Sequence, residues 1–194
     1  MQLKNLKTNY LGKINTFYKT IDSTQAEIWR LIDNKNIQNG TLIMADIQTK
    51  GKGTHGRIWH TDESENIAFS FFVETNCKSN LLDGITIEIA DILIKIFKEK
   101  YNVNLKIKEP NDIFYSNKKI GGILTESKVN SGIVKFLVIG IGLNTNKTKF
   151  TEDIQNIATS LKKEFSIDVN NQEIIEEFCY EFEKILKRRI NKWK

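Results

Sequence analysis

The sequence predicts an α+β fold with a mixed, largely antiparallel sheet flanked by helices. Short apolar segments rich in β-branched and aromatic residues alternate with clusters of turn residues, which is typical of strands. Longer segments place apolar residues three or four positions apart, which indicates helices packed on a core. Along the chain the order is strand, helix, strands, helix, strands and helices, and this order favours a mixed sheet covered by helices.

The N-terminal half supplies a strand, a helix and two more strands. Residues 14–18 form the first expected strand, and "DSTQAEIWRLID" follows as a helix that Asp22 or Ser23 can cap. "GTLIMADIQ" is apolar enough to be a buried strand. "NIAFSFFVE" is a second buried strand, rich in aromatic residues.

The C-terminal half begins with a helix expected over residues 80–99, because its apolar residues are three or four positions apart. "LKIKEPNDIFY", "KKIGGILTESKV" and "GIVKFLVIGIGLNTN" then predict three strands in an antiparallel meander. Asn117 and the pair Ser131-Gly132 supply the turns between them. The apolar residues from Ile174 to Trp193 again repeat at helical spacing.

Composition indicates an intracellular, reduced protein, which we expect to be cytoplasmic. The 194 residues contain 40% hydrophobic residues, enough for the core of one domain. No apolar segment approaches the roughly 20 residues of a membrane span, and the N-terminus lacks a signal-peptide pattern. Cys77 and Cys179 are too few for a disulfide framework or a zinc site. The net charge of +5 comes from dispersed lysines, which favours a lysine-rich surface over a nucleic-acid groove.

The stretch "GKGTHGRIW" (residues 51–59) combines glycines with cationic residues and is the first candidate site. It matches G-x-G-x-x-G, but a strand rather than a helix is expected to follow, which argues against a dinucleotide site. A Walker loop needs Ser or Thr after Gly-Lys, and Gly53 stands there. A glycine loop carrying Lys52 and Arg57 could bind phosphate or carboxylate oxygens, and Trp59 could stack on a base. The alternative is a solvated basic hairpin.

Two further segments have features of a binding site. In "KEPND" (residues 108–112), Pro110 stiffens a corner that presents Lys108, Asn111 and Asp112. Such a lysine can stabilise a phosphoryl or acyl transition state, although a plain turn would look the same. "KKIGGIL" and "VIGIGLN" contribute four glycines on neighbouring strands, which predicts either a face kept clear for a ligand or tight sheet packing. His55 and His60 lack partners at metal-ligand spacing, so no metal site made by protein ligands alone is expected.

Taken in order, "DST", "ADIQTKGKGTHGRIW", "KEPNDIFYSNKKIGGIL" and "VIGIGLN" resemble the biotin protein ligase family. The resemblance covers roughly residues 14–165. It implies a class II synthetase-like core, ATP and biotin as substrates, Mg²⁺ as cofactor and biotinyl-5′-AMP as intermediate. It also implies transfer of biotin to a lysine of a biotin carboxyl carrier protein, such as that of acetyl-CoA carboxylase. Lipoate ligase and a non-catalytic biotin or nucleotide sensor are the alternatives.

The resemblance also implies roles for individual residues. Lys108 and Lys52 would be catalytic. The biotin site would consist of Ser23, Thr24, Gln25, Gln48, Lys52, Gly53, Thr54, Lys108, Gly122 and Gly142. The ATP site would consist of Arg57, Trp59, Asn111 and Asn144.

Several residues depart from the family pattern. Lys52 stands where an arginine is usual, which keeps the charge but loses the bidentate geometry of a guanidinium. Thr54 stands where a second arginine is common, which predicts weaker retention of the adenylate. Glu109 replaces a tryptophan and Gln25 replaces an asparagine. From the position of the "DST" motif and of Lys194 we expect residues 1–194 to be one catalytic domain, without an N-terminal helix-turn-helix, a C-terminal β-barrel or a DNA partner. The sequence leaves open whether the chain is a monomer or a homodimer.

Overall fold

The structure is a computed structural model that describes residues 2–61 and 66–190. Its elements follow the predicted order of strands and helices. The strands are β1 (Asn15–Ile21), β2 (Leu42–Gln48), β3 (Ile67–Lys78), β4 (Lys106–Lys108), β5 (Asp112–Tyr115), β6 (Lys118–Asn130) and β7 (Ile133–Leu143). The α-helices are α1 (Thr24–Asp33), α2 (Ile85–Tyr101), α3 (Leu161–Phe165) and α4 (Asn171–Ile190), with 3₁₀ turns at Thr54–Gly56 and Ser79–Leu82.

The strands form one sheet in the order β1-β2-β3-β7-β6-β5-β4. β1 pairs with β2 in parallel, and all other neighbours pair antiparallel. The predicted mixed, largely antiparallel sheet is therefore confirmed. Ser131 and Gly132 both have positive φ, of 48° and 75°, and form the tight turn between β6 and β7. The predicted meander in this region is also confirmed.

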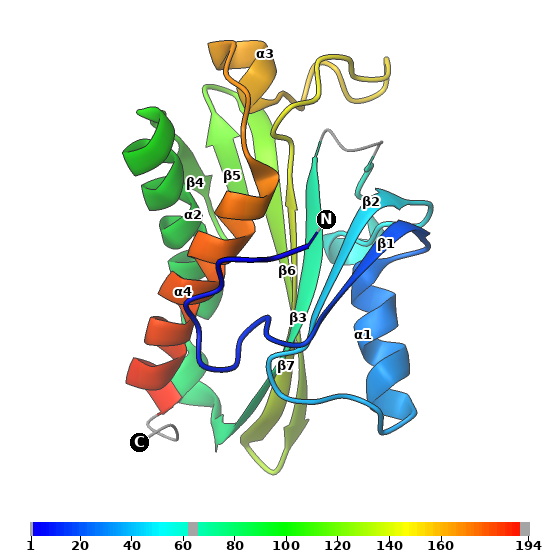
Figure 1. The fold of residues 1–194 in the computed structure, drawn as a ribbon, viewed down its shortest axis with the longest axis vertical. Helices are drawn as coiled ribbons and strands as arrows, with labels where there is room; N and C mark the ends of the chain where they lie inside the picture. The colour runs from blue at the N-terminus through cyan, green and yellow to red at the C-terminus, as the bar shows by residue number, and fades with distance from the viewer. Residues whose placement is uncertain (1, 62–65, 191–194) are drawn as a thin grey trace.

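Helices cover both faces of the sheet (Figure 1). α2 and α4 lie on one face, over the larger core, where Phe178 stacks on Phe71 and Phe182. α1 lies on the other face, over a smaller core that includes Ile28, Phe72 and Val138. Because α1 is only ten residues long, it leaves part of that second face without a covering helix.

The N-terminal segment, residues 2–14, is attached to α4 by two carboxylates. Glu176 accepts the backbone N–H groups of Lys4 and Asn5 at 2.7 and 2.9 Å. Two turns further along the helix, Glu183 accepts the backbone N–H groups of residues 9–11 at 3.0–3.1 Å. The segment has no regular secondary structure of its own, so these bonds satisfy its backbone where it crosses the helix.

Two predicted boundaries were wrong. The helix expected from residue 80 begins at Ile85, because Gly84 has a φ of 76° that an α-helix does not allow, and a 3₁₀ turn precedes it. The segment "LKIKEPNDIFY" is not one strand but a hairpin, in which β4 and β5 pair around the turn at residues 109–111. The C-terminal helix is confirmed as far as Ile190, whereas the expectation for Trp193 falls outside the described residues.

Candidate active site

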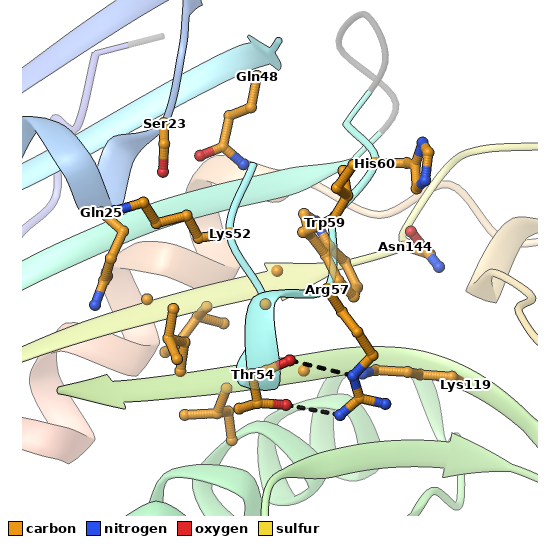
Figure 2. Close-up of a pocket in the computed structure, with 18 of the residues that line it drawn as sticks. Ser23, Gln25, Gln48, Lys52, Thr54, Arg57, Trp59, His60, Lys119 and Asn144 are labelled. Atoms are coloured by element: carbon orange, nitrogen blue, oxygen red, sulfur yellow. Dashed lines mark hydrogen bonds between the residues drawn. The ribbon is translucent and has the colours of Figure 1, made fainter. Parts of the chain in front are cut away.

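A cavity of about 190 Å³ opens on the sheet face that α1 leaves uncovered. β6 and β7 form its floor, the N-terminus of α1 forms one end, and residues 51–60 cross above it (Figure 2). The predicted residues that line it are Ser23, Thr24, Gln25, Gln48, Lys52, Gly53, Thr54, Arg57, Trp59, Asn111, Gly122, Gly142 and Asn144. Every predicted site residue except Lys108 is therefore brought to one place.

Three glycines leave the floor of the cavity free of side chains. Gly122 and Gly142 are paired neighbours on β6 and β7, and Gly140 lies two residues away on the same face. A Cβ on Gly142 would overlap the indole ring of Trp59, so the absence of a side chain makes room for that ring. Gly121 faces the opposite side, where a Cβ would meet Leu143, because adjacent residues of a strand alternate between faces. Of the two explanations that the sequence left open, a cleared face applies to Gly122, Gly140 and Gly142, and tight packing applies to Gly121.

The N-terminus of α1 supplies the polar end of the cavity. Ser23 is the N-cap, and its hydroxyl accepts the Ala26 N–H at 3.4 Å. The backbone N–H and hydroxyl of Thr24 both donate to Gln48 Oε1, at 2.8 and 3.1 Å, which fixes the Gln48 amide. Hydrogen bonding to Arg30, opposed by burial, lowers the pKa of Asp22 to about 2. Asp22 is therefore ionised and paired with Arg30, at 2.8 Å, and does not line the cavity.

The glycine-rich stretch is a hairpin, as one of its interpretations predicted. The backbone N–H of Trp59 donates to the Gly51 carbonyl and the backbone N–H of Gly53 donates to the Arg57 carbonyl, at 2.9 and 2.8 Å. Arg57 is exposed and donates to the carbonyl and hydroxyl oxygens of Thr54, at 3.2 and 2.7 Å (Figure 2). Lys52 extends from the hairpin toward the α1 end of the cavity. The stretch can therefore bring two cationic side chains and an indole face to one ligand.

Lys119 of β6 also lines the cavity, although the sequence analysis gave it no role. Its ammonium lies 2.7 Å from Asp112 Oδ1 and 5.6 Å from the centre of the Trp59 ring. Simple alternation would place Lys119 on the face opposite to Gly122. The register between β5 and β6 shifts between Ile113 and Phe114, however, so Lys119 shares a face with Gly122. That irregularity aims the lysine into the site.

The structure does not bring Lys108, the predicted catalytic lysine, into the cavity. It lies on β4, the edge strand of the sheet, and its side chain is exposed. Its ammonium lies 4.9 Å above the Phe114 ring. Asp112, which pairs with Lys108 across the hairpin, directs its carboxylate to Lys119 instead. Of the two lysines, only Lys119 is in position to contact a ligand on the glycine floor.

The charge of the lining is one-sided. Lys52, Arg57, Lys119 and Lys147 line the cavity, and no Asp or Glu does so among the described residues. Fixed positive charge in a partly enclosed site favours anionic ligands. Within residues 2–61 and 66–190 no three His, Cys, Asp or Glu side chains gather as a metal site. The arrangement suits a carboxylate beside a phosphate, with Trp59 available for stacking.

Other lining residues were missed by the sequence analysis. The loop after β7 contributes Lys147 and Phe150, and the next turns contribute Ile154, Ile157 and Ala158. These residues carry no recognisable motif. They reach the site because the irregular segment that contains them is bonded to β6: the Lys119 N–H donates to the Ile157 carbonyl, and the Thr159 N–H donates to the Lys119 carbonyl, both at 2.9 Å. The one signal in the sequence that could have identified a missed residue was the position of Lys119, three residues before the "GIL" of the quoted motif.

No helix in the described part of the chain has the length and hydropathy of a membrane span.

Comparison with known proteins places this chain in a family. Residues 17–144 match the profile of the Biotin/lipoate A/B protein ligase family. The chain is 32% identical over 181 residues to the Bifunctional ligase/repressor BirA of Bacillus subtilis, which covers 92% of this chain and 55% of that protein. It is 28% identical over 177 residues to the Biotin–protein ligase of Homo sapiens, covering 86% of this chain and 24% of that protein. The chain thus spans about half the length of the bacterial relative, and less of the human one.

A solved structure has the same architecture. The biotin protein ligase from Aquifex aeolicus in complex with biotin and ATP superposes with a TM-score of 0.78 at 30% identity. The match covers 93% of this chain and 73% of that one. The expectation of a biotin ligase-type core, drawn from four short motifs, is therefore confirmed.

Proposed function

We propose that this chain, which belongs to the biotin/lipoate A/B protein ligase family, is an ATP-dependent biotin–protein ligase. The chain would join the carboxylate of biotin to the α-phosphate of ATP, releasing pyrophosphate and forming biotinyl-5′-AMP. It would then transfer the biotinyl group to one lysine of a biotin carboxyl carrier protein. The observation that carries the proposal is the cavity with a cationic lining and a glycine floor, which can hold two anionic partners together.

The two ends of the cavity suggest how the substrates divide it. The polar groups of Ser23, Thr24 and Gln48 would bind the uncharged ring system of biotin, since they offer hydrogen bonds but no charge. Trp59, Arg57 and Lys119 lie toward the opposite end, where they suit the adenine ring and phosphates, whereas Lys52 extends toward the polar end (Figure 2). Bringing the two substrates into one enclosed site supplies much of the rate enhancement, because the reaction then resembles an intramolecular one.

Lys119 is the lysine that we assign to the reacting carboxylate and α-phosphate oxygens, in place of Lys108. As the carboxylate attacks phosphorus, negative charge shifts from the carboxylate to the oxygens of the α-phosphate and of the leaving pyrophosphate, and an ammonium group beside the α-phosphate stabilises it. Asp112 holds the Lys119 ammonium at 2.7 Å, so the group is already oriented before the ligand enters. Lys52 on the hairpin would add a second cation when the hairpin lies over the substrates.

Magnesium would be held mainly by the phosphates of ATP. The described residues that line the cavity offer it no carboxylate, and Asp112 is paired with Lys119. When bound there, Mg²⁺ would neutralise negative charge on the phosphates of ATP. We further propose that the ligase acts in the cytoplasm on a carrier domain of acetyl-CoA carboxylase or a similar biotin-dependent enzyme.

The proposal is tested by incubating the purified chain with ATP, Mg²⁺ and a recombinant carrier domain, with biotin or lipoate as the acid. We expect pyrophosphate release that depends on biotin and a mass increase of the carrier by one biotinyl group. A lipoyl adduct instead would favour the lipoate-ligase alternative. Biotin binding without pyrophosphate release would favour the sensor alternative and would contradict the proposed activity.

A further inference from the structure

Glu126 of β6 lies behind the polar end of the cavity and does not line it. Its Oε2 atom accepts the Trp29 indole N–H at 2.7 Å and a Gln25 amide N–H at 2.8 Å. Gln25 and Trp29 are one turn apart on α1, so they project from the same side of the helix. One carboxylate oxygen on the sheet therefore holds two residues of the covering helix.

The surroundings of Gln25 decide which way its amide points. Its NH₂ group donates both to Glu126 and to the Val138 carbonyl, the latter at 3.2 Å. A carboxylate and a carbonyl only accept hydrogen bonds, so they require the nitrogen and not the oxygen of the amide on that side. The carbonyl oxygen Oε1 must then point the other way.

Gln25 Oε1 points over Gly140 on the cavity floor. A Cβ on Gly140 would lie 2.7 Å from this oxygen. Gln25 is only 3% exposed, and Oε1 is buried without a hydrogen-bond partner in the structure. A buried acceptor that lacks a donor costs free energy, and a ligand N–H at this position would remove that cost.

We propose that Glu126 is a positioning residue that fixes the Gln25 amide so that its oxygen accepts an N–H from the ligand. The inference rests on the proposed function, and it adds a basis for selecting the acid. The cyclic urea of biotin carries N–H donors, whereas the dithiolane ring of lipoate carries none. A fixed acceptor in a buried site rejects a ring that cannot donate to it.

The test measures the dissociation constants of biotin and of a non-hydrolysable ATP analogue by calorimetry, each alone. Glu126→Met keeps the size of the side chain but removes the acceptor, so we expect biotin to bind about five- to tenfold more weakly, with nucleotide binding unchanged. Glu126→Gln keeps an oxygen that can accept both N–H groups and should restore biotin affinity to within about twofold. Glu126→Thr, a good strand former too short to reach Gln25, serves if the methionine variant does not fold.

A double variant separates positioning from general stability. Gln25→Leu removes the acceptor itself, so adding Glu126→Met to it should cause no further loss of biotin affinity. An equal loss in both backgrounds, equal weakening of nucleotide binding, or unchanged biotin binding by Glu126→Met would each overturn the inference. If the wild-type chain bound no biotin, both the proposed function and the inference would be contradicted. If the wild type bound biotin and the Glu126→Met variant bound it equally well, only the inference would be contradicted.

Discussion

Replacing Glu183 by glutamine should destabilise the fold strongly, because this buried carboxylate anchors the N-terminal segment to α4. It accepts the backbone N–H groups of Asn9, Tyr10 and Leu11, and Lys187 lies 2.9 Å from it. Burial alone would raise the pKa of Glu183, but the backbone N–H of Asn9, the Lys187 ammonium and the other two N–H groups outweigh it. Together they lower the pKa from an ordinary 4.5 to about 2.

That shift sets the size of the effect. About 2.5 pH units correspond to about 3 kcal/mol of stability that the ionised carboxylate contributes at neutral pH. For a chain of this length, such a loss lowers the melting temperature by about 6 to 12 °C. Since the folded-state pKa of Glu183 is the lower one, its contribution is complete above pH 4.5. It is then lost as the pH falls toward 2.

The assay is urea unfolding of wild type and Glu183→Gln at pH 7 and at several pH values down to 2.5. Glu177→Gln is the matched control on the same helix, because Glu177 is 42% exposed and lies 3.9 Å from Lys100. It should change the free energy of unfolding by less than about 0.5 kcal/mol. The reasoning is refuted if the two variants are equally stable at pH 7. It is also refuted if the deficit of Glu183→Gln persists unchanged at the lowest pH.

Two further predictions concern the cavity. Gly142→Val should weaken binding of an ATP analogue at least about tenfold, since a side chain at this position displaces the Trp59 ring. The control variant Gly132→Asn, at the β6–β7 turn, should bind the analogue normally, and calorimetry that finds both variants equal to wild type would contradict the assigned floor. Thr54→Arg should slow escape of biotinyl-5′-AMP several-fold by adding a cation to the hairpin, and trapping of free adenylate with hydroxylamine would show no change if the hairpin does not contact it.

Much of the fold follows from local chemistry that a sequence displays. The pair Ser131-Gly132 predicts a tight turn because few other pairs adopt positive φ at both positions, and Ser23 predicts the start of α1. The start of α2 was predicted too early because Leu82 fits the helical spacing. Gly84 interrupts the helical backbone between Leu82 and Ile85, so α2 begins only at Ile85. Apolar spacing reports which side chains face a core, but it does not report a break in the backbone.

The site was predictable as a set of motifs but not as a geometry. Motifs identified the hairpin, the α1 end and the glycine floor, because each needs particular residue types at a fixed spacing. Lys119 was missed because an irregular pairing of β5 with β6 reverses the face that strand alternation gives it. Lys108 was preferred because Pro110 marks a rigid corner, and only the sheet order reveals that this corner lies on the edge strand.

The central claim is that Lys119, on the glycine floor, activates the carboxylate for reaction with ATP. The most direct measurement is the rate of biotin-dependent pyrophosphate release by Lys119→Met and by Lys108→Met, with folding checked by melting temperature. We expect the Lys119 variant to lose at least about a hundredfold in rate, as when one stabilising group is removed from a developing charge, and the Lys108 variant to keep most of its rate. Normal turnover by Lys119→Met, or loss of turnover only in Lys108→Met, would contradict the account.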